Sequence, residues 1–358
     1  MLPKLDAEKI RLAVLDKEVF VAPDFFIDHF VRYPRDYPSL EAEFGRVVSQ
    51  GGGNVLGTEQ YITKGGNAVN TAIALGCLHV KTNLFTVTDS LGFDLLKYFV
   101  GTLPVDISLV RTDGVASITT AFEIQSGEGK LTNIMVSASG SLLTMGTEHL
   151  TDAVLELAKK SSVVCFFNWS QTKRGTEIVQ ALFKVVKEEG KGMTFFDSSD
   201  PSYKKDEIPL LVRQIFDNKL VNVMGMNENE FARFSKALGL TSHEGSKLQS
   251  GADLLSLSER MSCRIDYHTA EFSATAHEGQ YELMPCFRID PVRATGSGDT
   301  WNAGDILGYL SNLPDRDRLL LANATAASYI TNPVPKPSTL EEVAAFALSR
   351  SLKKISID

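Results

Sequence analysis

The segment T-G-S-G-D at residues 295–299 combines residue types that suit the transfer of a phosphoryl group. Glycine permits a tight turn in which successive amides point at one centre, and a helix expected directly after it adds the partial positive charge of its amino end. The amides of Gly296, Ser297 and Gly298 are therefore candidates for holding a phosphate. Asp299 stands where a substrate hydroxyl would lose its proton, so it is a candidate general base. An acid after glycines also caps helices that bind no phosphate, and this segment alone leaves both interpretations open.

A second glycine turn, Gly65-Gly66, precedes Asn67, Asn70 and a run of apolar residues with helical spacing. Main-chain amides and carboxamides at the start of a helix both donate and accept hydrogen bonds, which suits the neutral hydroxyls of a polyol. The alternative is a plain glycine turn with Asn67 as the helix cap, and the segment judged by itself favours that alternative.

Two acids follow the first expected strand, residues 19–22. Ligands of open α/β sheets bind beyond the carboxyl ends of the strands. Asp28 is therefore a candidate acceptor of hydrogen bonds from two adjacent sugar hydroxyls. Asp24 is an alternative, and either acid is also compatible with a solvated turn.

Asn227 and Glu230 follow an expected strand at residues 220–224 and begin an expected helix at residues 228–238. Hard oxygen ligands of this kind hold a hydrated Mg²⁺ ion through its waters. Acids in a first helical turn also interact favourably with the helix dipole, so a structural role explains both residues equally well.

The bulk properties indicate a soluble globular protein. The 358 residues are 43% hydrophobic, the net charge is −8 and the pI is near 5.4, so the chain has no basic excess for a nucleic-acid backbone. The amino-terminal residues contain no apolar run long enough to cross a membrane, and a cytoplasmic location is expected. P-loop, dinucleotide-binding and nucleophile-elbow motifs are missing. The four cysteines form no C-x-x-C pair; they are Cys77, Cys165, Cys263 and Cys286.

Short apolar segments alternate with longer amphipathic ones along most of the chain, which predicts one α/β domain, residues 1–358, with a mostly parallel sheet. Residues 30–64 and 112–137 break this rhythm and are expected to form a small sheet that covers the site as a lid, although a surface insertion and a hairpin are an alternative. The expected core strands are 162–167 and 193–197, and the remaining expected helices are 176–189, 208–218, 300–312 and 340–352.

The order of these motifs resembles the ribokinase-like, or PfkB-type, carbohydrate kinases over residues 12–350. That family has an acid after its first strand, an early Gly-Gly-Asn segment, an N-x-x-E in mid-chain and a late G-x-G-D whose acid is the base. The resemblance implies a three-layer α/β/α sandwich with a β-sheet lid. It also implies transfer of the γ-phosphoryl group of ATP to a hydroxymethyl group of a sugar or nucleoside, with Asp299 as base.

The same resemblance implies the ligands of the other motifs. Mg²⁺ would be held through its waters by Asn227 and Glu230. Homodimers that pair through the lid occur among similar proteins, and the sequence leaves the oligomeric state of this chain open. Thr295 and Asn323 would lie on the nucleotide side. The acceptor would be bound by Asp28, Gly65, Gly66, Asn67 and Asn70.

Three departures from the family pattern leave alternatives open. Pro23 replaces a glycine near the first strand, and Arg293 replaces an acid before the G-x-G-D motif. The segment Asp266–Phe272 stands where the family carries a glycine-containing nucleotide loop. ADP is therefore an alternative donor, and a catalytically silent sugar- or nucleotide-binding protein is an alternative function. A nicotinamide oxidoreductase is a third hypothesis.

Overall fold

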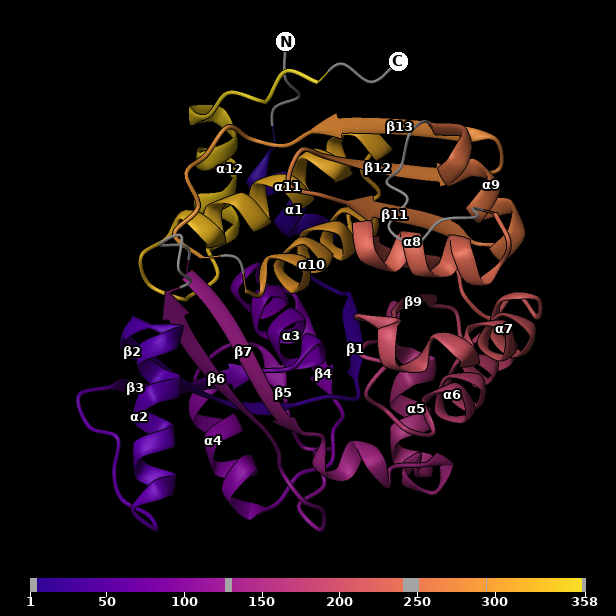
Figure 1. Cartoon of the computed structure of the whole chain (residues 1–358). Helices are drawn as coiled ribbons and strands as arrows, with labels where there is room; N and C mark the ends of the chain where they lie inside the picture. The colour runs from indigo at the N-terminus through magenta and orange to yellow at the C-terminus, as the bar shows by residue number, and fades with distance from the viewer. Residues whose placement is uncertain (1–4, 126–130, 241–250, 294, 356–358) are drawn as a thin grey trace.

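The computed structural model describes residues 5–125, 131–240, 251–293 and 295–355. Within them, nine strands form one sheet in the order β13-β12-β11-β10-β9-β8-β1-β4-β5 (Figure 1). All pairs from β5 to β11 are parallel, whereas β12 and β13 run antiparallel to their neighbours. The strands are β1 (Glu18–Ala22), β4 (Lys81–Leu84), β5 (Val105–Asp106), β8 (Val163–Phe166), β9 (Met193–Asp197), β10 (Val223–Asn227), β11 (Arg264–His268), β12 (Phe272–His277) and β13 (Gln280–Pro285).

Helices cover both faces of this sheet. Alternate residues of β1 belong to two separate cores: Val19 and Val21 to one, Phe20 and Ala22 to the other. Strand side chains point to opposite faces in turn, so the two cores lie on the two sides of the sheet. The first core contains residues of α1 (Ala7–Ala13), α3 (Asn67–Cys77), α4 (Ser90–Val100), α10 (Ser297–Leu310), α11 (Asp315–Thr331) and α12 (Leu340–Ser349). The second contains residues of α5 (Asp152–Lys160), α6 (Gly175–Glu189), α7 (Ile208–Leu211), α8 (Glu228–Ala237) and α9 (Gly251–Met261). The predicted three-layer sandwich is confirmed.

A smaller, separate sheet has the order β3-β2-β6-β7 among the described residues. Its strands are β2 (Phe26–Asp36), β3 (Glu59–Gly65), β6 (Ser117–Gln125) and β7 (Leu131–Ala138), so its strands come from both expected lid segments. Residues 126–130 of the second segment lie outside the described residues. We call these four strands the lid.

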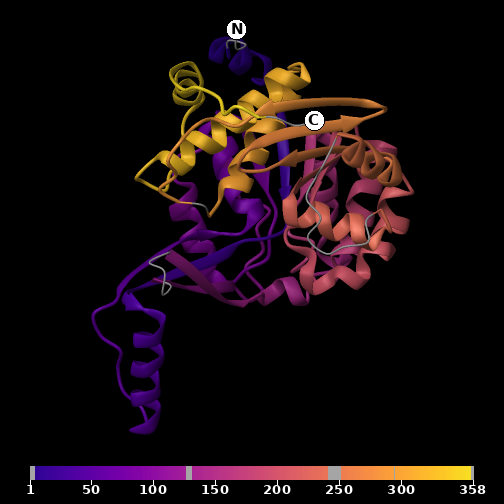
Figure 2. The same cartoon turned by 45° about the horizontal axis from the view of Figure 1, so that its top comes forward.

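The first lid segment also contains a helix that the sequence did not predict, α2 (Tyr37–Ser49), which extends away from the body in Figure 2. Asp36 caps it by accepting a hydrogen bond from the Ser39 amide at 3.1 Å, and Pro38 lies in its first turn. Both features are typical helix starts, so the proline that suggested irregular chain was in fact a helix signal.

Three expected boundaries need correction. The strand expected at 220–224 is β10, which begins at Val223, because Leu220 still bonds to Ile215 and closes the preceding helical segment at 3.0 Å. That segment is not one helix over 208–218: α7 ends at Leu211 and passes into a π-helical stretch, Val212–Phe216. The helix expected from residue 300 is α10, which begins at Ser297.

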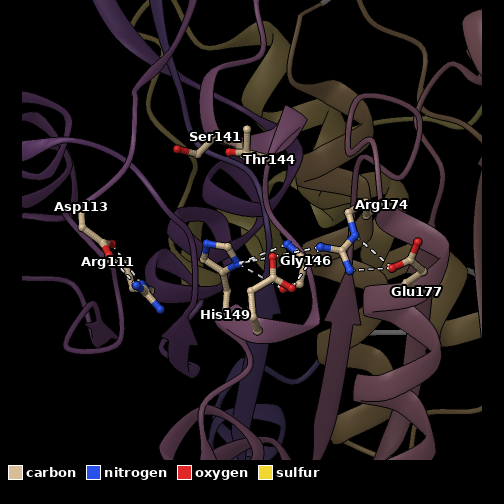
Figure 3. A network of polar contacts seen from close by, with 9 residues as sticks. Arg111, Asp113, Ser141, Thr144, Gly146, His149, Arg174 and Glu177 are labelled. Carbon is tan, nitrogen blue, oxygen red and sulfur yellow. Dashed lines mark hydrogen bonds and ion pairs between the residues drawn. The ribbon is translucent and has the colours of Figure 1, made fainter.

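The chain leaving the lid is attached to the body by a polar network (Figure 3). Arg174, at the start of α6, donates from one guanidinium nitrogen to Glu148 at 2.9 Å and from the other to Glu177 at 2.8 Å. The Gly146 amide donates to Nδ1 of His149 at 3.2 Å. A Cβ at Gly146 would overlap with the Arg174 guanidinium, so glycine permits this close approach.

In the part of the chain that the structure describes, none of the helices combines the length and apolar character needed to cross a bilayer.

Candidate active site

Asp299 lies in the first turn of α10 and is held by side chains from another helix. Its Oδ1 accepts a hydrogen bond from Nδ2 of Asn67, and its Oδ2 accepts one from Nδ2 of Asn70, both at 2.8 Å. The cap of α10 is Gly296, so the interpretation of Asp299 as a mere helix cap is wrong. Burial raises the pKa of Asp299 from 3.8 to about 7, while the bond from Asn70 opposes that shift. A carboxylate with a pKa near neutrality suits a general base.

The amino end of α10 has the geometry of an anion site. Gly296 adopts a left-handed conformation with φ of 80°, and its carbonyl accepts from the Thr300 amide at 3.1 Å. A Cβ at this position would lie 3.1 Å from the hydroxyl of Tyr329, so both the backbone angle and the space favour glycine. Amides in the first turn of a helix have no carbonyl acceptor within the helix, so the amide of Gly298 suits an anion such as phosphate, and the same role for Ser297 stays a prediction.

The structure separates the roles of the two acids after β1. Asp24 is fully buried and accepts hydrogen bonds at 2.8 Å from the amides of Asn67 and Ala68 and from Nδ2 of Asn168. It therefore fixes the start of α3. The amides of Asn67 and Ala68 are bonded to this carboxylate and so do not meet the hydroxyls of a polyol, whereas acceptor binding by Gly65 and Gly66 stays a prediction.

Asp28 lies on β2 and faces a cavity of about 840 Å³. Burial raises its pKa from 3.8 to about 7, with Lys64 acting in the opposite direction and Asp24 in the same direction. A Cβ at Gly65, on the neighbouring strand, would overlap with the Asp28 carboxylate, so the glycine permits the two strands to present this acid. Gly66 then caps α3 with φ of 93°.

The cavity lies between the lid and the body. Phe30 and Tyr61, paired on β2 and β3, stack with ring centroids 4.9 Å apart and form one wall. The opposite wall contains Thr295, expected on the nucleotide side, and Gly296. The lining residues are Asp28, Phe30, Arg32, Tyr61, Thr63, Lys64, Asn70, Glu123, Asn133, Val292, Arg293, Thr295, Gly296, Tyr329, Pro333 and Pro335.

Lys64 is a residue of this cavity that the sequence reasoning missed. Its Nζ donates to Oδ1 of Asn70 at 2.6 Å. Burial lowers its pKa from 10.5 to about 8, while Asp299 acts in the opposite direction. The one local signal is its place in the sequence: Lys64 directly precedes the glycine turn at the end of β3.

Asn227 and Glu230 form a complete capping box at the start of α8. Oδ1 of Asn227 accepts from the Glu230 amide at 3.1 Å, and the Glu230 carboxylate accepts from the Asn227 amide at 2.8 Å. The structural role of both residues is therefore confirmed, and their Mg²⁺ role stays a prediction.

Glu230 is a buried acid that lies near a second acid, Asp197. Burial raises the pKa of Glu230 well above its usual value, and the neighbouring Asp197 adds to that effect. Burial likewise raises the pKa of Asp197 to about 6. Among the described residues, no group of three or more His, Cys, Asp or Glu side chains is placed to ligate a metal directly. The oxygen atoms of Asn227 and Glu230 are of the hard type that Mg²⁺ prefers.

Two further expectations concern the nucleotide side. Asn323 is buried, its Oδ1 accepts from Nε1 of Trp301 at 2.9 Å, and its Nδ2 donates to β13 carbonyls at 3.3 Å. These bonds indicate a structural role, and contact with adenine stays a prediction. The expected loop Asp266–Phe272 is wrong in extent, because residues 266–268 belong to β11 and only 269–271 form the turn to β12.

Comparison with known proteins gives a consistent result. The family model of the pfkB family carbohydrate kinases matches residues 39–341. A ketohexokinase of Haloferax volcanii is 26% identical over 237 residues, which cover 63% of this chain and 60% of that protein. The chain is thus matched over less than two thirds of that relative.

Solved structures show the same fold. A ribokinase from Cryptococcus neoformans in complex with ADP superposes with a TM-score of 0.71 at 15% identity, over 92% of this chain and 98% of that one. An adenosine kinase from Sinorhizobium meliloti gives a TM-score of 0.70 at 17% identity, over 93% and 98% of the two chains.

Proposed function

The chain belongs to the pfkB family of carbohydrate kinases, and we propose that it transfers the γ-phosphoryl group of ATP to a hydroxymethyl group of a sugar or nucleoside. The observation that carries this proposal is the position of Asp299. Its carboxylate accepts hydrogen bonds from the side chains of Asn67 and Asn70, both at 2.8 Å, and it follows the candidate anion site directly in sequence. Two residues near it, Asn70 and Gly296, line a cavity of about 840 Å³.

Each part of the site has a chemical role in this reaction. Asp28 accepts hydrogen bonds from the acceptor hydroxyls, while Asn70 lies at the base of the same cavity. Asp299 takes the proton from the attacking hydroxymethyl group. The amides of Ser297 and Gly298 donate to the oxygens of the phosphoryl group as negative charge develops there.

Mg²⁺, when bound to the nucleotide, neutralises charge on its phosphates. We assign its waters to Asn227 and Glu230, which carry the hard oxygen atoms that this ion prefers. Asp197 lies close enough for its charge to act on Glu230, so a second carboxyl group is available near the assigned residues.

The acceptor class follows from the relatives and the cavity together. The names of the similar proteins include a ketohexokinase, an adenosine kinase and a ribokinase. The stacked Phe30 and Tyr61 offer an apolar surface, and Asp28 offers a polar one. Both a sugar ring and a nucleoside present these two kinds of surface. A cytoplasmic location, where nucleoside triphosphates are available, belongs to the same proposal.

A thermal-shift screen tests the ligands. Ketohexoses, ribose and adenosine are added with ATP or ADP and Mg²⁺, and every pair that raises Tm is assayed for a phosphomonoester product by ³¹P NMR. Product formed with ATP supports the proposal, and product formed only with ADP identifies an ADP-dependent kinase. Stabilisation without product for any pair would favour the silent binding protein, which the sequence of the β11–β12 turn first suggested.

A further inference from the structure

Lys64, on β3, connects the lid to Asp299 through one side chain of α3. Its ammonium donates to Oδ1 of Asn70 at 2.6 Å, and Nδ2 of the same carboxamide donates to Oδ2 of Asp299 at 2.8 Å. A carboxamide has an acceptor on one side and a donor on the other. An ammonium is a donor only, so the bond from Lys64 selects the orientation in which Asn70 presents its NH₂ group to Asp299.

The charges around Asp299 give Lys64 a second effect. Four ionisable groups that carry no positive charge interact electrostatically with Asp299. They are Asp24, Asp197, Glu230 and Tyr329. Of the charged groups with the largest effects on the pKa of Asp299, Lys64 is positive, whereas Asp24 and Asp197 are negative. It also faces Asp28 on β2 and Cys77 on α3.

We propose that Lys64 is the positioning residue of the base: it orients Asn70 toward Asp299 and supplies the positive charge that favours the ionised carboxylate. The inference rests on the proposed function, in which Asp299 removes the acceptor proton. Lys64 also lines the cavity. Because it belongs to β3, it links Asp299 to the lid.

The two groups define a pH window. Asp299, with a pKa of about 7, is ionised above that pH, whereas Lys64, with a pKa of about 8, is protonated below that pH. Both charged forms coexist between these values.

Three substitutions separate the two effects of Lys64. Lys64→Met removes both the donor and the charge, Lys64→Gln keeps a neutral donor for Asn70, and Lys64→Arg keeps a donor and a permanent charge. Lys204→Met is the matched control. Lys204 is also a buried lysine, held by the carbonyls of Thr172 and Lys173 at 2.8 and 3.1 Å, and none of its hydrogen bonds goes to Lys64, Asn70 or Asp299.

The direct measurement is a ¹³C NMR titration of the ligand-free protein labelled at aspartate carboxyl groups, with the Asp299 signal assigned by its loss in Asp299→Asn. The titration midpoint of Asp299 is expected to rise by about one pH unit in Lys64→Met and Lys64→Gln. It should stay near the wild-type value in Lys64→Arg and Lys204→Met. An unchanged midpoint in a folded Lys64→Met protein, checked by circular dichroism, would overturn the charge effect.

Kinetics with the acceptor found in the screen test the positioning effect. At a pH where Asp299 is ionised in every variant, kcat should fall in Lys64→Met and recover in Lys64→Gln, with KM for ATP unchanged. Equal kcat in these two variants overturns the orienting role. In Lys64→Arg, which keeps both a donor and a positive charge, kcat should stay near the wild-type value.

Failure of this inference is distinguishable from failure of the proposed function. If the Asp299→Asn protein transfers phosphate as fast as the wild type, Asp299 is not the general base and the proposed mechanism fails. If Asp299→Asn is inactive but the Lys64 variants leave the titration midpoint of Asp299 and kcat unchanged, only the positioning role of Lys64 is refuted.

Discussion

At the scale of single residues, the buried acid Asp28 makes the free energy of unfolding depend on pH. Its pKa is raised from 3.8 to about 7, so the folded state prefers its protonated form. The contribution of the protonated Asp28 to the free energy of unfolding is fully present below pH 3.8, and it is lost as the pH rises toward 7. Asp28→Asn keeps the shape without the charge, so its Tm should rise relative to wild type between pH 5 and pH 8.

Differential scanning fluorimetry of ligand-free protein across that range measures the effect of Asp28. Asp206→Asn, at an exposed position, is the control, for which a constant difference in Tm is expected. A wild-type protein that gains stability over Asp28→Asn as the pH rises would show that Asp28 is charged and well stabilised in the fold.

Gly65 is predicted to be required because of the space it leaves for Asp28. A Cβ at Gly65 would overlap with the Asp28 carboxylate, so Gly65→Ala must displace that acid. We expect a loss of about 1–3 kcal/mol in the free energy of unfolding and weaker acceptor binding. Chemical denaturation and the thermal shift with acceptor measure the two effects.

The control for Gly65 is Gly45→Ala. Gly45 lies within α2, and a Cβ there would meet nothing within 4 Å. That substitution should stabilise the helix by about 0.5–1 kcal/mol and leave acceptor binding unchanged. Two alanines with the same effect on binding would contradict the steric account of Gly65.

At the scale of elements, a buried ion network joins β11 to α10 and α11. Arg318 on α11 is 1% exposed, donates to Asp266 of β11 at 2.9 Å and contacts Asp305 of α10. Removing one partner of a buried pair leaves uncompensated charge. Arg318→Met should therefore lower the free energy of unfolding by about 3–5 kcal/mol.

Arg260→Met is the matched control, because Arg260 pairs with Asp217 at 3.1 Å where both side chains are about two-fifths exposed. An exposed pair of this kind contributes about 1 kcal/mol or less. Denaturant titrations compare the two variants, and equal losses would show that the network on Arg318 adds nothing beyond a surface pair.

The elements also show what the sequence predicts and what it does not. Continuous apolar runs predicted β8 and β9 because both faces of these strands are covered. The helix α2 was missed because proline and glycine in residues 32–60 outweighed a helix start at Asp36 and Pro38. The segment at 266–272 was assigned to a nucleotide loop because the partner of Asp266, Arg318, is 52 positions away along the chain.

The same limit applies to the site. Asp299, Asn67 and Asn70 were predicted as separate motifs from local residue types. Their mutual contact was not, because it joins positions 229 and 232 apart in sequence. Asp24 and Asp28 had equal local signals, and only the packing of α3 shows that Asp24 serves its amino end.

At the scale of the whole molecule, the lid leaves an apolar surface on the side away from the cavity. Ile62, Ile118, Ile134 and Val136 are each 41% to 59% exposed. In the register of the strands, Ile134 and Val136 lie opposite Phe122 and Thr120, so they share one face. A homodimer that pairs through the lid stays a prediction, and this surface is where the second copy would lie.

Analytical ultracentrifugation tests this assembly. The wild type should sediment as a dimer, and Val136→Lys should shift the equilibrium toward monomer because it places a charge in the apolar contact. Lys97→Ala, on the exposed side of α4, is a control that should not alter the assembly. A monomeric wild type at concentrations well above those of the assay would contradict the lid-mediated dimer.

The most direct test of the proposed reaction is to measure phosphoryl transfer and ligand affinity side by side in wild type and Asp299→Asn. Loss of the base should lower kcat by about 10²-fold or more, while the affinities for acceptor and nucleotide change little because Asn keeps the shape of the side chain. An Asp299→Asn protein with wild-type kcat would contradict the assignment of Asp299 as the base.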